Sequence, residues 1–259
     1  MKLAIIQPYF FPYIGYFQLM NAVDEFVVYD NIQYSKKGWI NRNRILVNGS
    51  ASYISIPLRK DSDYLDVRDR YLADNWCRNR KKILNRITEA YRRAPQFASV
   101  YPIIEKSVLC GESNLFQFIS HSLSLVKEYL EIRTPLIISS TIPVDQSINA
   151  ESRVIAICKE RRASTYLNPI GGVALYNKEV FTSAGIDLFF LKSGNIRYRQ
   201  FNYGFTPCLS IIDVMMFNEK DVIRQYLDSQ YVLVGNDSIR SDAGSGRAVG
   251  VFGGDDNGD

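Results

Sequence analysis

The sequence contains few of the side chains that bind metals or form disulfides. It has one histidine, His121, and four cysteines, which lie 33, 48 and 50 residues apart without a Cys-x-x-Cys pair. The cysteines are Cys77, Cys110, Cys158 and Cys208. This spacing favours reduced, buried thiols of a cytoplasmic protein over a disulfide framework or a zinc site. A single histidine also excludes a histidine-rich metal site, so we expect no metal and interpret His121 as a structural residue.

Long apolar runs are also absent from the sequence. No stretch approaches the roughly 20 continuous apolar residues of a membrane-spanning helix, and the run at residues 3–6 is too short for the core of a signal peptide. Neither a P-loop nor a G-x-G-x-x-G motif occurs. Hydrophobic residues make up 46% and charged residues 22% of the 259 residues, which is typical of a globular chain. We expect a cytoplasmic protein without a membrane span.

The net charge of +4 is unevenly distributed along the chain. Residues 36–93 contain fifteen lysines and arginines against six acidic residues, and such a local excess indicates an anionic ligand. A solvated basic helix over residues 78–93 is the alternative interpretation. Residues 235–259 contain seven glycines and five aspartates, and a stretch with so little to bury stays disordered. We therefore predict one α/β domain over residues 1–234 and a disordered tail over residues 235–259.

Hydrophobic periodicity along the chain predicts alternating strands and helices. Strands are predicted at residues 3–6, 25–30, 51–58, 136–140, 165–167 and 187–191. Helices are predicted at residues 15–22, 75–94, 113–130, 150–161, 177–184, 210–217 and 219–226. Gly185 follows one of them, where a helix C-terminal glycine belongs, and the first strand, helix and strand form a βαβ unit with parallel strands. The pattern predicts an α/β fold with a mostly parallel, Rossmann-like open sheet flanked by helices, and an additional helical portion.

The segment Gln7–Phe17 joins the first predicted strand to the first helix. Because it leaves the carboxyl end of a parallel strand, it lies at the edge where open α/β sheets bind ligands. Two prolines stiffen it, Gly15 permits close approach of the backbone, and the helix start offers free N–H groups to an anion. We predict that Gln7, Tyr9 and Tyr16 belong to a binding site. A loop that only packs its aromatic rings is the alternative.

A second polar segment, residues 30–44, leaves the next predicted strand at the same edge. It is dense in hydrogen-bond donors, and an arginine guanidinium binds a phosphate or carboxylate through two parallel hydrogen bonds. Its tryptophan has a flat ring on which a base or sugar stacks. The candidate residues in this segment are Asp30, Gln33, Lys36, Trp39, Asn41, Arg42, Asn43 and Arg44. A turn with a solvated basic flank is the alternative.

The predicted strand at residues 165–167 is followed by Asn-Pro-Ile-Gly-Gly. A glycine pair after a strand holds backbone close to a ligand, and the same pair also makes ordinary turns. Because this segment converges on the same edge, Asn168, Gly171 and Gly172 join the candidate binding residues. Asp213, in a helix near the end of the fold, either stabilises the start of that helix or faces the site. No setting for Ser-His-Asp chemistry is recognisable.

At these segments the sequence resembles the WbqC-like family, found in bacterial gene clusters for surface polysaccharides such as O-antigen (a lipopolysaccharide component). The resemblance rests on QPYFFPYIGYFQLMNAVDEFVVYD, GWINRNRI, STYLNPIGG and TPCLSIIDVM, and covers roughly residues 1–230. It implies a role in O-antigen assembly, with attachment of glycine or a similar amino acid to an amino sugar as the proposed reaction. Residues 11–20 also resemble the ATP-binding first loop of nucleotidylyltransferase-type proteins. There Tyr13 or Tyr16 stands in place of histidines, so that resemblance is an analogy.

The resemblance and the candidate residues lead to an amino-sugar N-acyl or aminoacyl transferase, for example a glycyl transferase, acting on a nucleotide-linked sugar. Gln7 and Asp30 are the predicted catalytic residues, which orient the sugar amine, and Asp30 takes its proton. Asn41–Arg44 bind the donor or a phosphate, and three rings stack on sugar or base: Trp39, Tyr9 and Tyr16. The expected partner is the nucleotide-linked amino sugar or another small anionic ligand. The expected cosubstrate is ATP or another activated acyl donor, such as an aminoacyl-tRNA or acyl-CoA.

Two other classes of function are open from the sequence. No residue is recognisable as a nucleophile, which favours a non-catalytic protein that binds sugar nucleotides or scaffolds a pathway. The basic residues 78–93 favour nucleic-acid binding, although nucleic acid is the less expected partner. Binding through phosphate contacts weakens steeply with added salt, whereas binding of a sugar nucleotide in a pocket does not.

Overall fold

The computed structural model describes residues 1–235, and its main element is a six-stranded sheet. In spatial order the strands are β5 (Leu136–Ile138), β2 (Glu25–Val28), β1 (Lys2–Ile6), β6 (Thr165–Pro169), β7 (Asp187–Ser193) and β8 (Tyr231–Gly235). The first five are parallel, and β8 pairs with β7 in the antiparallel direction. The predicted α/β class, the mostly parallel sheet and the parallel pairing of the first two strands are confirmed.

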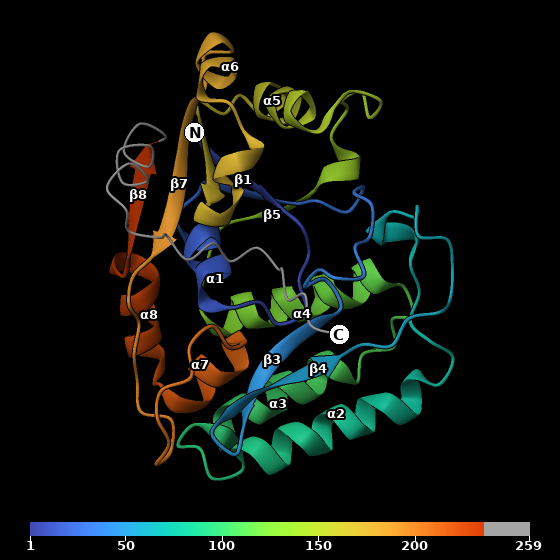
Figure 1. Cartoon of the computed structure of the whole chain (residues 1–259), viewed down its shortest axis with the longest axis vertical. Helices are drawn as coiled ribbons and strands as arrows, with labels where there is room; N and C mark the ends of the chain where they lie inside the picture. Colours follow the sequence, from blue (N-terminus) through green and yellow to red (C-terminus); the bar gives the residue numbers. More distant parts are fainter. Residues whose placement is uncertain (236–259) are drawn as a thin grey trace.

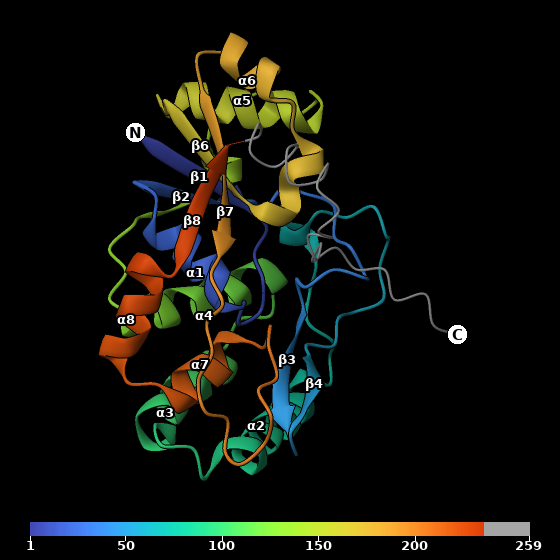
Figure 2. The same ribbon diagram turned by 60° about the vertical axis from the view of Figure 1, so that its left-hand side comes forward.

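Helices cover both faces of the sheet (Figure 1). One face carries α5 (Ala150–Glu160) and α6 (Lys178–Ser183), and the other carries α1 (Ile14–Asn21), α4 (Leu115–Tyr129) and α8 (Lys220–Ser229), as the turned view in Figure 2 shows. Two sets of buried apolar side chains fill the two sides. Leu3 and Ile5 of β1 belong to the set beneath α5, whereas Ala4 and Ile6 belong to the other. Burial on both faces explains the continuous apolar sequence of β1.

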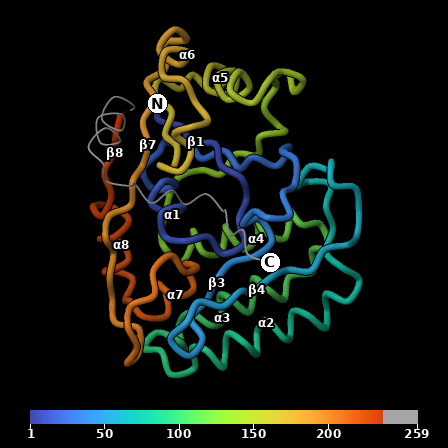
Figure 3. The backbone as a smooth tube through the Cα atoms, viewed as in Figure 1, coloured from blue at the N-terminus to red at the C-terminus, as the bar shows by residue number. Residues whose placement is uncertain are grey.

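The additional portion is built from the segment between β2 and β5 and from one later helix. After β2 the chain forms β3 (Arg42–Val47), β4 (Ser50–Ser55), the 3-10 turn η1 (Val67–Asp69), α2 (Trp76–Tyr91), α3 (Phe97–Val108) and α4, a path that Figure 3 follows. The later helix, α7 (Ile211–Phe217), packs against α3 and β3. β3 and β4 form an antiparallel hairpin outside the main sheet.

Two glycines occupy positions that require a positive φ. The hairpin turn is Asn48-Gly49, with φ of 50° and 79°, and this residue pair is the one that a tight two-residue hairpin favours. Gly185, with φ of 76°, ends α6 as its position in the sequence predicts.

Apart from the 3-10 turns, two strands and one α-helix of residues 1–235 were not predicted from the sequence: β3, β8 and α3. β3 carries alternating arginine and asparagine, which we interpreted as a binding segment, and α3 contains Pro102, a residue that disfavours a helix interior. The predicted strand at 51–58 is shorter, because β4 ends at Ser55. The predicted tail begins at Gly235, which is the last residue of β8, and residues 236–259 lie outside the described residues.

Candidate functional site

The strand order creates a point at which chain connections diverge, between β1 and β6. From β1 the chain continues to β2 and β5 on one side, while β6 continues to β7 on the other. Open α/β sheets bind ligands outside the carboxyl ends of the strands at such a point. Gln7 directly follows β1 and Asn168 lies near the carboxyl end of β6, so the structure places these two predicted residues on the two central strands.

Gln7 and Asn168 also continue two series of side chains on one face of the sheet. Leu3 and Ile5 of β1 and Tyr166 of β6 all belong to the core beneath α5. Because side chains alternate along a strand, Asn168 points to that face, and Gln7 occupies the next position in the series of Leu3 and Ile5, one residue beyond the end of β1. Two residues with amide side chains therefore lie at the ends of adjacent strands.

Gly172 allows the side chain of Asn168 to pack closely against the following 3-10 turn, η3 (Ile170–Leu175). Nδ2 of Asn168 donates a 2.8 Å hydrogen bond to the hydroxyl of Tyr166, and a Cβ at Gly172 would overlap Oδ1 of Asn168. Gly172 is buried and Gly171 is exposed. The glycine pair thus fixes an amide at the strand end and leaves the adjacent backbone open to solvent.

Asp30, the predicted proton acceptor, follows β2 and is buried. Its Oδ1 accepts hydrogen bonds from Ser139 Oγ at 2.7 Å and from the Ser140 amide at 2.9 Å. Its Oδ2 accepts one, from the hydroxyl of Ser140 at 2.7 Å. Ser139 and Ser140 lie in the turn η2 (Ser139–Thr141) after β5, so Asp30 ties the carboxyl ends of β2 and β5 together. Since Ser140 is exposed, Oδ2 is the oxygen nearer to solvent.

The loop after β1 is held by aromatic packing. The hydroxyl of Tyr16 donates a 3.2 Å hydrogen bond to the carbonyl of Gln7, and the Tyr16 ring is buried. Tyr9 packs on it with ring centroids 5.8 Å apart and is half-buried. Tyr16, predicted as a stacking residue, therefore supports the loop from the core. Tyr9 is half-buried against the core, and Tyr13 is exposed.

The backbone of this loop is strained at Phe11, whose φ is 42°. Two side chains hold its carbonyl: Asn43 Nδ2 donates at 2.8 Å and Ser210 Oγ donates at 2.8 Å. Asn43 also donates to the carbonyl of Phe10 at 3.2 Å. Asn41 accepts from the Tyr34 hydroxyl and donates to a carbonyl of the hairpin region. The predicted binding asparagines Asn41 and Asn43 are thus engaged in internal hydrogen bonds.

The predicted arginines project from the hairpin around Trp39. Trp39 stacks on Tyr53 with centroids 6.0 Å apart, and the guanidiniums of Arg42 and Arg44 lie 5.9 and 5.2 Å from the Trp39 ring. Arg42 donates to the carbonyls of residues 37 and 38. Arg44 donates to the carbonyl of Cys208 at 3.3 Å, and its Nε is buried without a partner. These rings and guanidiniums form a partly exposed cationic surface, which we name the hairpin surface.

Gln33 and Lys36 lie apart from the hairpin surface. Lys36 forms a 2.6 Å ion pair with Asp63, and Gln33 donates to the carbonyl of the same residue at 2.9 Å. Both side chains are exposed. They hold the segment before η1, so the structure does not bring them to the strand ends with Gln7 and Asn168.

Comparison with known protein families identifies the family to which the chain belongs. The model of the WbqC-like protein family matches residues 7–225. The chain belongs to the WbqC-like family. It is also similar to an uncharacterized protein of Mycobacterium tuberculosis, with 28% identity over 221 residues that cover 84% of this chain and 93% of the relative. No solved structure shows significant similarity.

Two residues that sequence reasoning missed, Ser193 and Cys208, join the loop after β1 in this WbqC-like protein beside Tyr13, which the sequence suggested only through the analogy with the nucleotidylyltransferase loop. A Cβ at Gly15 would overlap the Tyr13 ring and would lie 2.6 Å from Ser193 Oγ at the end of β7. Desolvation, followed by the nearby Tyr9 and Cys208, raises the pKa of Tyr13 to about 12, although 37% of the side chain is exposed. Tyr13, Ser193 and Cys208 therefore extend the edge toward the hairpin surface. Only their convergence in space identifies them.

Cys208 is not an activated nucleophile. Burial raises the pKa of its thiol, and the guanidinium of Arg44 lowers it by less. The thiol is therefore protonated at neutral pH, whereas catalytic cysteines react as thiolates.

Asp213 stabilises the fold that carries the hairpin surface in the WbqC-like chain. It is fully buried and accepts hydrogen bonds from Tyr91 at 2.8 Å, Tyr198 at 2.7 Å and Gln200 at 2.6 Å. Burial raises the pKa of its carboxyl. The Tyr91 hydroxyl in turn accepts from the Leu46 amide of β3. Of its two predicted roles, Asp213 fills the first, because it lies in the first turn of α7. Its burial excludes direct exposure to a site, and its hydrogen bonds connect α7, α2 and β3.

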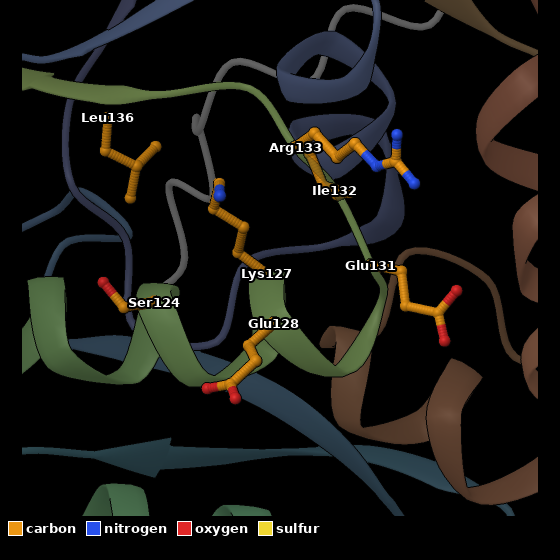
Figure 4. A pocket seen from close by; sticks show the side chains of 7 residues that line it. All are labelled: Ser124, Lys127, Glu128, Glu131, Ile132, Arg133 and Leu136. Carbon is orange, nitrogen blue, oxygen red and sulfur yellow. The ribbon is translucent and has the colours of Figure 1, made fainter.

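Two cavities of the described chain lie away from the strand ends. The larger, of about 600 Å³, is lined by Ser124, Lys127, Glu128, Glu131, Ile132, Arg133 and Leu136 (Figure 4). Leu136 begins β5, so this cavity is at the amino end of that strand, and Glu131 there is paired with Arg224 and Lys220. The other, of about 460 Å³, lies between residues 58–60 and 73–75. Neither contains a predicted site residue, and the carboxyl edge is the better candidate on topology.

Residues 1–235 contain no helix long and apolar enough to cross a membrane. In the same residues no group of three or more His, Cys, Asp or Glu side chains is arranged to hold a metal ion.

Proposed function

We propose that this WbqC-like protein forms an amide on a nucleotide-linked amino sugar during assembly of a bacterial surface polysaccharide such as O-antigen. The observation that supports the proposal is that Gln7, Asp30 and Asn168 each lie at or just after the carboxyl end of a parallel strand, β1, β2 and β6 respectively. Amide formation needs a held amine, a proton acceptor and donors for a developing oxyanion. This edge offers all three types of group.

In the proposed reaction the sugar amine attacks the carbonyl of an activated acyl or aminoacyl donor. The new amide C–N bond forms as the bond from that carbonyl to the leaving group of the donor breaks, and the leaving group (AMP from an acyl-adenylate, tRNA or coenzyme A) departs with the bonding electron pair. Gln7 and Asn168 orient the sugar, and Oδ2 of Asp30 accepts the amine proton after the Ser140 hydroxyl turns away. The hairpin surface binds the donor, because Arg42 and Arg44 supply positive charge beside the flat ring of Trp39. The absence of an activated thiol at Cys208 agrees with direct attack rather than a two-step transfer.

The test is amide formation by the purified chain. Nucleotide-linked amino sugars are incubated with glycine and ATP, with glycyl-tRNA or with acetyl-CoA, and the product is detected by mass spectrometry. Asp30→Asn should lower kcat at least tenfold and leave sugar-nucleotide binding within twofold. Lys159→Ala, an exposed change on α5, is the matched control and should alter neither.

A second candidate function, binding without catalysis, is favoured by the three hydrogen bonds that already engage Asp30. A carboxylate held in this way acts as a structural anchor. Binding of a nucleotide-linked amino sugar without an amide from any of the three donors supports this alternative and overturns the transferase proposal. If no sugar nucleotide binds, both proposals are wrong.

A further inference from the structure

Arg153 is a cation at the strand ends that the proposed reaction does not use. It lies in the first half of α5, after the cap residue Asn149. Because α5 leads into β6, its amino end lies at the carboxyl edge of the parallel strands, on the same face as Asn168. Arg153 reaches the end of β2 as well, since it contacts Asn31.

The N–H donors of the Arg153 guanidinium form only weak hydrogen bonds within the protein, or none. Nη1 donates to the Asn31 carbonyl and Nη2 to the Ile148 carbonyl, both at 3.4 Å, which is longer than an ordinary N–H···O hydrogen bond. Nε is buried and has no partner. An arginine has five N–H donors and no acceptor. Arg153 therefore has unused donor capacity at the strand ends.

No carboxylate in residues 1–235 forms an ion pair with Arg153. Asp66 is near enough to interact with it electrostatically, but the ion pair of Asp66 is with Arg68, at 3.8 Å. By contrast, Arg161 at the other end of α5 is paired with Glu25 at 2.6 Å. Arg153 within α5 and Arg161, the C-cap residue of that helix, thus differ: Arg161 has an anionic partner, and Arg153 at the carboxyl edge has none among the described residues.

Aromatic hydroxyls surround the same place. The Arg153 guanidinium lies 5.8 Å from the centroid of the Tyr29 ring, and Tyr29 interacts electrostatically with Tyr176. Tyr176 also lies 3.3 Å, hydroxyl to hydroxyl, from Tyr166, which accepts from Asn168. In the described chain the Tyr29 hydroxyl forms no hydrogen bond. A guanidinium over the ring of a tyrosine whose hydroxyl is free offers both a charged and a neutral donor suited to a phosphoryl group.

We infer that Arg153, together with the Tyr29 hydroxyl, binds a phosphoryl group of the ligand at the carboxyl edge of β1, β2 and β6. Under the proposed function, on which this assignment rests, the group is the diphosphate of the nucleotide-linked sugar. The diphosphate then lies on the α5 face, and the acyl donor approaches from the hairpin surface on the side of α1. The two anionic reactants thus bind to different arginines: the sugar diphosphate to Arg153, and the acyl donor to Arg42 and Arg44.

The inference is tested by isothermal titration with pyrophosphate and with uridine diphosphate, each at two salt concentrations. Arg153→Ala should weaken both at least tenfold, Arg153→Lys less, and Tyr29→Phe a few-fold. Lys159→Ala removes an exposed charge from the same helix and should leave both affinities within twofold. Acetate, which has no phosphoryl group, should not bind measurably at the same concentrations. If Arg153→Ala lowers the melting temperature, Arg153→Lys and Tyr29→Phe, which keep the packing, decide the result.

Three outcomes overturn the inference: no binding of either probe to the wild type, equal affinity in Arg153→Ala, or an equal loss in Lys159→Ala. Acetate binding as tight as pyrophosphate also overturns it, because the site then selects a carboxylate. If Arg153→Ala loses probe binding and the wild type forms no amide product, the inference is supported and the transferase proposal is rejected. Amide formation with unchanged probe affinity in Arg153→Ala rejects only the inference.

Discussion

The side-chain amide of Asn43 donates a 2.8 Å hydrogen bond to the carbonyl of Phe11, the residue with a φ of 42°. A bulky residue adopts this left-handed conformation only where surrounding contacts enforce it, and such strain concentrates at functional sites. Asn43 belongs to the hairpin and Phe11 to the loop after β1. The hairpin therefore determines the shape of the loop that leads from Gln7 to α1.

Asn43→Ala should destabilise the protein. It leaves the carbonyl of Phe10 and the amide of Arg44 without their partners and removes one of two donors to Phe11. We expect a loss of about 1–3 kcal/mol in the free energy of unfolding, measured by urea denaturation. Asn79→Ala is the control, because its amide bonds within α2 are exposed, and it should change stability by less than about 0.5 kcal/mol. Equal midpoints for Asn43→Ala and wild type would contradict the prediction.

Gly172→Ala should damage the β6 end of the candidate site. The added Cβ forces the Asn168 side chain away from its position and breaks its hydrogen bond to Tyr166. We expect a loss of about 1–3 kcal/mol in stability and weaker binding of a nucleotide-linked sugar. Gly111→Ala, where a Cβ meets nothing within 4 Å, should be neutral or stabilising by up to about 1 kcal/mol. Equal effects of the two substitutions would show that Asn168 is not held by Gly172.

Asp213→Asn should change how stability depends on pH. Burial raises the pKa of Asp213 in the folded protein above its usual 3.8, so its favourable contribution is complete below that value and declines as pH rises through the folded-state pKa. The asparagine variant lacks this term, and its amide opposes the donors Tyr198 and Gln200, at a cost of about 1–3 kcal/mol. The stability advantage of the wild type should therefore shrink between pH 4 and pH 7 in urea titrations. An advantage that grows with pH would refute this.

Arg44→Ala and Arg42→Ala should weaken binding of an anionic ligand about ten- to a hundredfold, because each guanidinium is partly buried and held beside Trp39. The basic helix α2 supplies the contrast. Arg78, Lys81 and Lys82 are exposed, and solvated charges of this kind contribute individually less than about 1 kcal/mol. Titration with ATP, the anion that activates the donor in the proposed reaction, measures both groups at two salt concentrations. Larger losses from the α2 substitutions would transfer the binding function to that helix.

The sequence predicted the sheet well because its central strands are buried on both faces and read as apolar runs. The sequence of the hairpin also contains a signal that predicts strand β3. Asn41, Asn43 and Ile45 alternate with Arg42 and Arg44, a period of two that separates inward from outward side chains. The asparagines of this strand bond inside the protein, and its arginines lie at the surface.

Other contacts had no local signal. Arg153 meets Asn31 across 122 residues, and Arg44 meets Cys208 across 164 residues. In the sequence of α5 alone, nothing distinguishes Arg153 from an ordinary solvated arginine. Its position at the carboxyl ends of the strands follows only from the way in which α5 packs on the sheet, which is a property of the tertiary fold.

The strand order also determines when the sheet can form during synthesis. The amino group of Met1 contacts Ser164, 163 residues later, where β1 pairs with β6. At a ribosomal rate of roughly 5–20 residues per second, β6 is synthesised about 8–33 s after β1. Until then the backbone of β1 is paired along one edge only, by β2, and its other edge is open. We therefore expect nascent chains that end before β6 to bind chaperones that recognise exposed apolar segments.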